Sequence, residues 1–298
     1  MLLTQVPWAS KVWALPVLTA LAPSSRYCQQ QGLRYKKLTD WRLGSKPINI
    51  LMLGIAYQGI AFPVMWMVLN KAGISNTRER IALLQRFLAL VEPSRVLAIV
   101  ADREFIGHDW FTYLKAKRLL FVMRIKKNAL ITSRGRTRPA WMVFANAEKQ
   151  QASILPKRCW VYKVRLFLVA TRQDDGELVI LACTTKPELA LAFYSCRWEV
   201  ETLFASLKTR GFNLEDSHLT DGGRLEKLIA LLALAFTWAH LVGQWVHEQS
   251  PIRLKKHGYK AKSIFRVGLE VLRAAIVYPY AKGAKIDFTS CLKVLSGS

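Results

Sequence analysis

Residues 95–101 of the chain read RVLAIVA, a short apolar run that follows Pro93. A continuous run of this length is typical of a strand that is covered on both faces of a parallel sheet. A helical pattern follows near residues 108–117, and a second apolar strand is expected at residues 119–125. Strand, helix and strand in this order predict a parallel pair, and therefore an α/β fold.

The segments on either side extend this unit. Two apolar strands are expected at residues 48–57 and 60–69, followed by a helix over residues 77–90. From residue 126 to residue 183 the pattern changes to short β-like pieces separated by polar turns, which indicates a β-rich insertion. A long helix is then expected over residues 187–210, because proline stands at its start and glycine follows its end.

The charge of the chain predicts a polyanionic partner. Forty-four Lys and Arg against twenty Asp and Glu give a formal net charge of +24, which attracts nucleic acid and releases its counterions. Residues 115–172 hold fifteen Lys or Arg and a single acid, Glu148. This stretch predicts a surface that follows DNA phosphates, with Lys126 and Lys127 among its contacts. Charge alone would also fit an anionic membrane or a ribosomal neighbour.

Cysteine usage and hydropathy predict a cytoplasmic protein. The five cysteines are widely spaced and form no C-x-x-C pair, as expected of buried thiols in a reducing compartment. The apolar start has no basic residue before Lys11, so a signal peptide is not expected. Residues 228–246 are apolar enough to suggest a membrane span, but polar and aromatic side chains surround the helix. We expect a helix buried in the protein and no membrane partner.

One candidate for chemistry is Asp102, which follows RVLAIVA directly. At the carboxyl end of a parallel strand, side chains open into a crevice where ligands bind. An equally simple interpretation is that Asp102 caps the next helix or pairs with Arg103.

The second candidate is a set of four residues on the helix expected over residues 187–210. Tyr194, Arg197, Glu201 and Lys208 stand at spacings of three, four and seven, so they project from nearly the same side. One face thus offers a carboxylate, two cations and a phenol. Arg197 and Glu201 would also fit an ordinary surface ion pair, which contributes little to stability.

These four residues carry a resemblance to a known family. Their spacing matches the Tyr-Arg-Glu-Lys signature of the DDE transposases of bacterial insertion sequences, the family numbered four. Four segments look like the same family: KPINILMLGIAYQGIAFPV, ADREFIG, FYSCRWEVETLFASLKTRGFNLEDSHLTD and IRLKKHGYKAKSIFRVGLEVLR. The resemblance covers about residues 42–280. It implies a ribonuclease-H-like mixed sheet flanked by helices, with the β-rich insertion before the glutamate helix.

The resemblance also implies an activity, which is metal-dependent DNA cleavage and strand transfer. Asp102 would be the second aspartate and Glu201 the glutamate of a triad that binds two Mg²⁺, with Mn²⁺ as a substitute. Tyr194, Arg197 and Lys208 would contact DNA phosphates. The implied partners are the double-stranded DNA of transposon ends and target, and a second copy of the chain in a synaptic complex. The implied location is the nucleoid of a bacterial cytoplasm.

The chain departs from the family pattern at the first aspartate. In the family, this residue follows a first strand and lies in a motif Asp-Arg-Thr-Xaa-Trp. Here Trp41 occupies the tryptophan place, and Lys37 stands where the aspartate is expected. Asp40 is the nearest acid, and it could be the third catalytic metal ligand only if the backbone were shifted.

Residues 1–41 offer a reason for this departure. VPWASKVWALPVLTALAPSSRY and YKKLTDW resemble the interior of a different group of insertion-sequence transposases. We hypothesise a fusion of two transposase genes near Trp41, which leaves a foreign segment at residues 1–41 and a catalytic domain at residues 42–298. The first strand would then be missing or replaced. The activity would be lost with the first aspartate, leaving a DNA-binding remnant; a nuclease that only cuts is a third interpretation.

Overall fold

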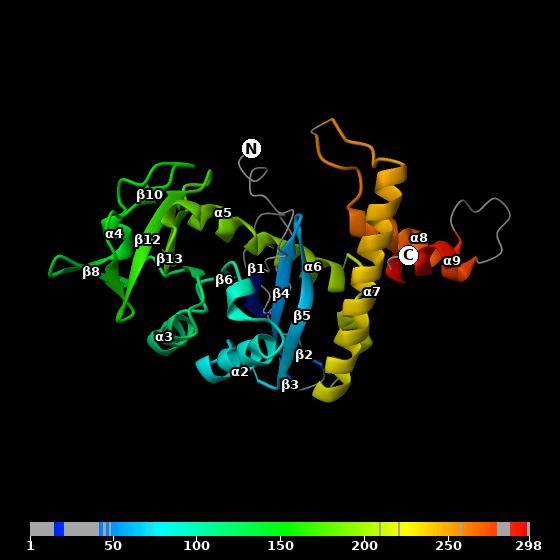
Figure 1. Ribbon diagram of the computed structural model, residues 1–298, viewed down its shortest axis with the longest axis horizontal. Helices are drawn as coiled ribbons and strands as arrows, with labels where there is room; N and C mark the ends of the chain where they lie inside the picture. Colours follow the sequence, from blue (N-terminus) through cyan, green and yellow to red (C-terminus); the bar gives the residue numbers. More distant parts are fainter. Residues whose placement is uncertain are drawn as a thin grey trace. The chain divides into compact units, whose positions relative to one another are not determined.

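The computed structural model describes residues 15–20, 42–43, 46–47, 49–71, 73–208, 210–219, 221–256, 258–278 and 287–296. They belong to two compact units, residues 1–203 and residues 204–298. Figure 1 shows the elements of both units along the chain.

The first unit is built on one mixed sheet. Its described strands follow the order β5-β4-β1-β6-β7-β13-β12-β11-β8-β9, and β10 pairs with β12 (Figure 1). The strands of this sheet are β1 (Leu15–Ala20), β4 (Asn49–Tyr57), β5 (Ile60–Leu69), β6 (Ile99–Ala101), β7 (Phe121–Arg124), β8 (Leu130–Ser133), β9 (Arg136–Pro139), β10 (Ser153–Ile154), β11 (Cys159–Val161), β12 (Val164–Arg172) and β13 (Leu178–Cys183). A separate small hairpin pairs β2 (Arg42–Leu43) with β3 (Lys46–Pro47).

Helices in the described residues accompany this sheet and form most of the second unit. They are α2 (Thr77–Leu88), η1 (Pro93–Arg95), α3 (His108–Ala116), α4 (Ala140–Val143), η2 (Pro187–Leu189), α5 (Ala190–Ser195), α6 (Arg197–Leu207), η3 (Leu214–Ser217), α7 (Gly222–Gln249), α8 (Ile264–Val277) and α9 (Phe288–Ser296).

The first five strands define the fold. In chain order they are β1, β4, β5, β6 and β7, and in the sheet they lie as β5-β4-β1-β6-β7. The strand β4 is antiparallel to both β1 and β5, whereas β1, β6 and β7 are parallel. This order and these directions are those of the ribonuclease-H-like fold, so the expected fold class is confirmed. The parallel pair β6–β7 was also predicted correctly.

The first strand comes from the foreign-looking segment. Residues 15–20 pair with β4 on one side and with β6 on the other. A strand is therefore present at this position, and the expectation that it is missing is wrong. Sheet pairing depends on main-chain groups that every residue except proline supplies in full, so many sequences can form such a strand.

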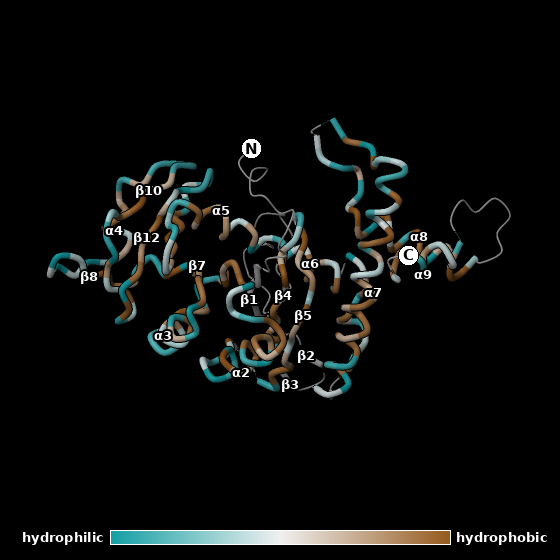
Figure 2. The backbone as a smooth tube through the Cα atoms, in the orientation of Figure 1, coloured by the Kyte–Doolittle hydropathy of each residue, from teal (hydrophilic) through white to brown (hydrophobic). Residues whose placement is uncertain are grey.

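One face of the sheet packs against α2 and α3. Leu51 and Leu53 of β4 alternate with residues of the other face, and they share a core cluster with Phe87 of α2 and with Trp110 and Phe111 of α3. All five side chains are fully buried. Figure 2 shows hydrophobic residues along β4 and its neighbouring strands. This core holds the end of β6 in a fixed position.

The helix expected over residues 187–210 is divided, so the prediction of one continuous helix is wrong. Residues 187–189 form the 3-10 turn η2, α5 ends at Ser195, and α6 runs only to Leu207. At the break, the N–H of Cys196 bonds to the carbonyl of Phe193 in a tightened turn. Leu189, in the turn η2, is 39% exposed and does not belong to the core.

Two other boundaries differ from the expectations. The run at residues 95–101 gives a strand of only three residues, because η1 takes Arg95 and the strand begins only at Ile99. Among the β-like pieces expected over residues 126–183, a boundary falls after Val161, where β11 and β12 are divided by a turn in which Tyr162 and Lys163 both have positive φ. Left-handed backbone at two successive residues is the geometry of a tight hairpin turn.

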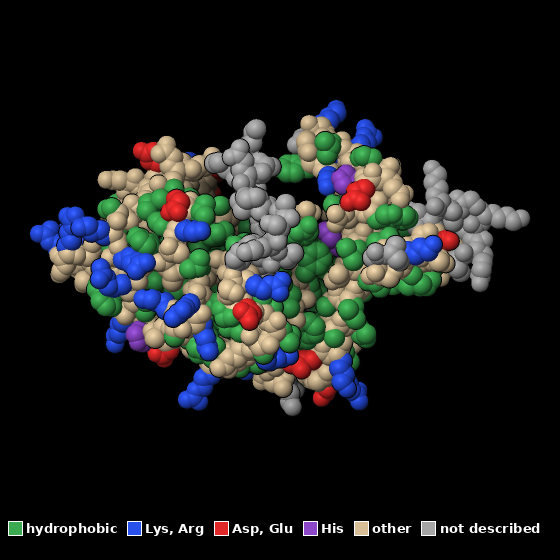
Figure 3. Space-filling model, in the orientation of Figure 1, with side chains coloured by type: hydrophobic (Ala, Val, Ile, Leu, Met, Phe, Trp, Pro, Cys, Tyr) green, Lys and Arg blue, Asp and Glu red, His purple; other side chains and the backbone are tan. Residues whose placement is uncertain are grey.

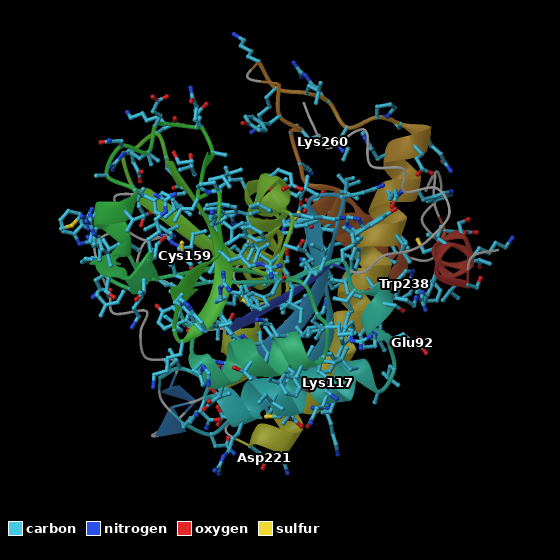
Figure 4. All side chains as sticks on the ribbon, turned by 60° about the vertical axis from the view of Figure 1, so that its left-hand side comes forward. Glu92, Lys117, Cys159, Asp221, Trp238 and Lys260 are labelled. Carbon is cyan, nitrogen blue, oxygen red and sulfur yellow. The ribbon has the colours of Figure 1, made fainter. Side chains whose placement is uncertain are left out.

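The second unit is a group of helices in which α7 and α8 pack closely. A Cβ atom at Gly268 of α8 would overlap the carbonyl oxygen of Ala239 and the amide nitrogen of Gly243, both on α7. The indole of Trp238, labelled in Figure 4, donates a hydrogen bond of 2.8 Å to the carbonyl of Cys291 and so joins α7 to α9. In the described part of the chain, α7 is the single helix long and apolar enough to cross a membrane, a test that core helices also pass.

Candidate functional site

Asp102 follows β6 directly, as the sequence predicted. Its Oδ1 accepts a hydrogen bond of 2.8 Å from the backbone N–H of Arg103 and one of 3.2 Å from the hydroxyl of Tyr194. The helix α3 begins after Gly107 and has no side-chain cap. The interpretation of Asp102 as a helix cap is therefore wrong, and its partner is instead a phenol on α5.

Arg197 and Glu201 form the ion pair that the helical spacing predicted. Nη1 of Arg197 lies 2.6 Å from Oε1 of Glu201, and the arginine side chain is only 12% exposed. The guanidinium also lies over the rings of Trp198 and Tyr194, at 4.5 Å and 5.5 Å from their centroids. Because the pair is mostly covered and the cation is stacked, it is more than an ordinary exposed pair.

The charges of this cluster support one another. Burial, and after it the negative charge of Asp102, raise the pKa of Tyr194 to about 12, so the phenol stays protonated and donates. Burial acts to lower the pKa of Arg197, but Tyr194, Asp102 and Glu201 together raise it above its ordinary value. The guanidinium of Arg197 therefore interacts favourably with both acids.

Arg124 belongs to the cluster and was missed by the sequence analysis. It is the last residue of β7, and its Nη2 lies 2.5 Å from Oε1 of Glu177. Burial lowers its pKa, but Tyr194, Glu177 and Asp102 raise it by a larger amount. The available signal was its place at the carboxyl end of a strand parallel to β6, since such ends share one edge of a sheet.

The other predicted contact residues lie as follows. Lys126 and Lys127 are exposed in the turn after β7, at the sheet edge that carries Asp102. Lys208 follows α6 and belongs to the second unit. Asp40 lies outside the described residues.

The strand β1 brings no acid to this edge. It pairs with β6 in parallel, with Val17 opposite Val100. Continuing this register by two residues places Thr19 at the level of Asp102. Residues 15–20 read LPVLTA, and the first acidic residue of the whole sequence is Asp40. A neutral residue therefore stands at the register position beside the acid of β6.

The described acids do not complete a site for two divalent ions. Hard cations take several oxygen ligands, mostly from carboxylates. Asp102 and Glu201 supply two carboxylates, and one oxygen of each already accepts hydrogen bonds from this cluster. Within the described ranges, no group of three Asp, Glu, His or Cys side chains could hold a metal ion. Among the described residues, the site has two of the three carboxylates that the resemblance implies.

Glu199 is a second acid on α6, on a different side from Glu201. Burial raises its pKa to about 7, although the backbone N–H groups of Gly59 and Tyr57 in the β4–β5 turn stabilise its charged form. Its Oε2 is buried without a hydrogen-bond partner. The cost of this buried charge makes the first unit sensitive to pH.

We expect Glu199→Gln to stabilise the protein above pH 7. The folded-state pKa of about 7 exceeds the ordinary value of 4.5, so the folded chain binds more protons between these values and its free energy of unfolding falls as pH rises. Removing the charge should raise the free energy of unfolding by roughly 1–2 kcal/mol at pH 8 and by almost nothing at pH 4.5. The value at pH 8 is kept small because the side chain is partly solvated. Urea unfolding at both pH values measures this difference.

The matched control is Glu92→Gln, because Glu92 is exposed (Figure 4) and carries the same charge. It should leave the pH dependence of unfolding unchanged. Equal effects of Glu199→Gln at pH 4.5 and pH 8 would contradict the assignment.

Comparison with known proteins places the chain in a family. The model of the family described as "Transposase DDE domain" matches residues 26–238, well over half of the chain. A solved structure that is similar is a piggyBac transposase synaptic complex with hairpin DNA, determined by cryo-EM, with a TM-score of 0.42 and 14% identity. The match covers 95% of this chain but only 57% of the piggyBac transposase chain. No curated protein matches the sequence.

The family match includes Asp102, Tyr194, Arg197 and Glu201, which the structure brings together around one guanidinium. It also includes the basic insertion between β7 and β13. The chain belongs to the transposases with a DDE domain.

Proposed function

We propose that this chain binds double-stranded DNA through its basic insertion and does not cut DNA by itself. The observation that carries the second half of this proposal is the neutral Thr19 at the register position beside Asp102. The remaining acids are offset by Arg197 rather than arranged as three free ligands. The protein then keeps the shape of a transposase and its attraction for DNA without the cleavage step.

The surface of the insertion supports DNA binding. Arg134, Arg136 and Arg138 line a hollow of about 520 Å³ between the β8–β9 hairpin and α4, and no acid lines it. Trp141 of α4 is 47% exposed, and it directly precedes Met142, which lines this hollow. Figure 3 shows Lys and Arg side chains gathered over the hairpin. Clustered cations that neutralise phosphates, with aromatic side chains nearby, are typical of nucleic-acid surfaces.

A catalytic transposase is the second candidate. It is favoured by one observation, the gathering of Asp102, Tyr194, Arg197 and Glu201 at one site. In this proposal Asp40 supplies the third carboxylate, and Mg²⁺ or Mn²⁺ supplies charge stabilisation during attack on phosphorus. Tyr194 orients Asp102, while Arg197 and Lys208 contact phosphates of transposon-end or target DNA. A homodimer would hold the two ends.

The finer family assignment is also a proposal. The Tyr-Arg-Glu-Lys spacing supports the insertion-sequence family numbered four, found in the bacterial cytoplasm. A fusion near Trp41 would divide the chain into residues 1–41 and 42–298, with the insertion at about residues 126–183. The family match runs from residue 26 through this joint, and the strand β1 lies before the match.

We expect the purified chain to bind a duplex with strong salt dependence and to leave it uncut. If six or more phosphates are contacted, the affinity should fall roughly 1,000-fold between about 50 and 200 mM salt. Fluorescence anisotropy measures binding, and nicking of a supercoiled plasmid with Mg²⁺ or Mn²⁺ measures cleavage. Arg138→Ala should weaken binding more than Arg78→Ala, which removes an exposed cation from α2.

The same assay separates the two candidates. Metal-dependent nicking that is abolished by both Asp40→Asn and Glu201→Gln would establish the catalytic candidate and overturn the non-cutting proposal. Binding that is insensitive to salt, or absent, would overturn the DNA-binding proposal itself.

A further inference from the structure

A second cationic hollow lies on the first unit, and it shares no lining residue with the hollow beside the β8–β9 hairpin. Its volume is about 350 Å³. Its lining contains four cations, two threonines and two leucines, and no acid; the residues are Lys115, Arg118, Leu119, Leu120, Arg158, Arg165, Thr184 and Thr185. A concave surface with one sign of charge concentrates anions.

The strand register places this hollow at the far edge of the sheet from Asp102. Asp102 follows the carboxyl end of β6, which is parallel to β7. Leu119 and Leu120 precede the first residue of β7, and Thr184 follows the last residue of β13, which runs antiparallel to β7. The hollow therefore lies at the amino end of β7, and the acids lie at its carboxyl end.

The four cations come from three elements, and most of them have no counterion. In the described residues, Lys115, Arg118 and Arg165 have exposed side chains that form no ion pair and no hydrogen bond. Cations at the carboxyl end of α3 would offset the helix dipole, which explains Lys115 and Arg118. The dipole of α3 does not explain the positions of Arg165 on β12 or of Arg158, which precedes β11.

Arg158 is held in place for a contact. Its guanidinium lies over the ring of Phe167, 4.9 Å from the centroid, and donates a hydrogen bond of 3.2 Å to the carbonyl of Thr184. A guanidinium fixed by stacking still presents other N–H donors and loses little freedom on binding an anion. Arg158 thus offers fixed N–H donors, and the three exposed cations around the hollow add positive charge. Together they suit the oxygen atoms of a phosphate group.

Arg118 occupies a position that its side chain does not favour. Its φ is 56°, and its N–H bonds to the carbonyl of Lys115 while the N–H of Leu119 bonds to the carbonyl of Leu114. These two bonds are the Schellman motif, in which glycine is the preferred residue at this place. An arginine with left-handed backbone therefore stands at the rim of the cationic hollow, at a place where glycine would fit with less strain.

We propose that this hollow is a phosphate-binding site that takes a backbone phosphate of DNA, separate from the acid cluster and from the hairpin. It gives the first unit a second point of contact with a duplex, at the opposite edge of the sheet. Only the choice of DNA as the source of the phosphate rests on the proposed function. Inorganic phosphate carries the same chemistry and serves as a second probe.

The test uses Arg118→Gly, which removes the cation and relieves the left-handed backbone at the same time. Thermal unfolding should show an unchanged or higher midpoint, so weaker binding cannot be attributed to misfolding. The slope of log affinity against log salt should fall by about one, as expected for one lost phosphate contact. Arg78→Ala is the control of equal charge, and it should leave the slope nearly unchanged.

The second measurement is the shift in unfolding midpoint caused by inorganic phosphate, compared with chloride at equal ionic strength. The full chain should be stabilised by phosphate, and Arg118→Gly should lose most of that stabilisation while Arg78→Ala keeps it. A DNA slope and a phosphate shift that are both unchanged in Arg118→Gly would overturn the site. Phosphate binding without DNA binding would keep the phosphate site and reject DNA as its ligand. If the full chain binds no DNA but is still stabilised by phosphate, the result would count against the proposed function and not against the phosphate site.

Discussion

Thr19→Asp should turn a chain whose unfolding does not respond to Mg²⁺ or Mn²⁺ into one that these ions stabilise. The register of β1 and β6 places residue 19 at the level of Asp102, so the substitution adds a carboxylate beside the existing acids. Without metal, the added charge should lower the free energy of unfolding through repulsion. With metal at about ten times its dissociation constant, binding should return roughly 1.4 kcal/mol.

Thermal unfolding with and without metal measures this gain, and plasmid nicking measures whether cleavage returns with it. The control is Ala20→Asp, because neighbouring residues of a strand belong to opposite faces of a sheet. It adds the same charge on the face away from Asp102 and should be destabilising with or without metal. An equal metal response in the two variants would contradict the register argument.

Gly268→Ala should destabilise the second unit by about 3 kcal/mol. The added Cβ would overlap the carbonyl oxygen of Ala239 and the amide nitrogen of Gly243, which are backbone atoms and cannot rotate away. α7 and α8 would have to separate, and the contact that buries Phe236 and Phe265 would open. For a unit of this size, the unfolding midpoint should fall by roughly 10 °C or more.

Gly223→Ala is the matched control, because it makes the same change near the start of α7. A Cβ atom there would meet only Asp221 Oδ1, at 3.4 Å. Since alanine favours helix over glycine, this variant should be neutral or slightly stabilising. Circular dichroism during heating compares the two. A Gly268→Ala protein as stable as the parent would show that the two helices do not pack as closely as described.

Much of the fold could be predicted from local patterns. The strands β4 and β5 and the helices α2 and α3 lie within a few residues of their expected bounds, because each has a clear apolar periodicity. The division of the helix at Cys196 could not be predicted, since its sequence has neither proline nor glycine at the break. The break depends on tertiary packing, which local preference does not contain.

The candidate site could also be predicted only in part from the sequence. The spacing of Tyr194, Arg197 and Glu201 indicated a shared face, and the structure confirms that Arg197 pairs with Glu201. The bond from Tyr194 to Asp102 joins residues 92 positions apart and could not be read from spacing. Arg124 escaped notice because it was counted only among the many cations. The neighbour of Asp102 on β1 required the strand register, which no sequence pattern near residue 19 specifies.

The central place of β1 has a consequence for how such a gene can change. β1 lies between the antiparallel strands β4 and β5 and the parallel strands β6 and β7, so it connects the two halves of the sheet through main-chain bonds. Many short extended segments of suitable length can make those bonds, whereas the catalytic triad that the resemblance implies would need a carboxylate from this segment. Recombination at the start of the gene can therefore exchange the strand and silence the reaction while the scaffold persists, and a copy altered in this way could still compete with intact copies for DNA.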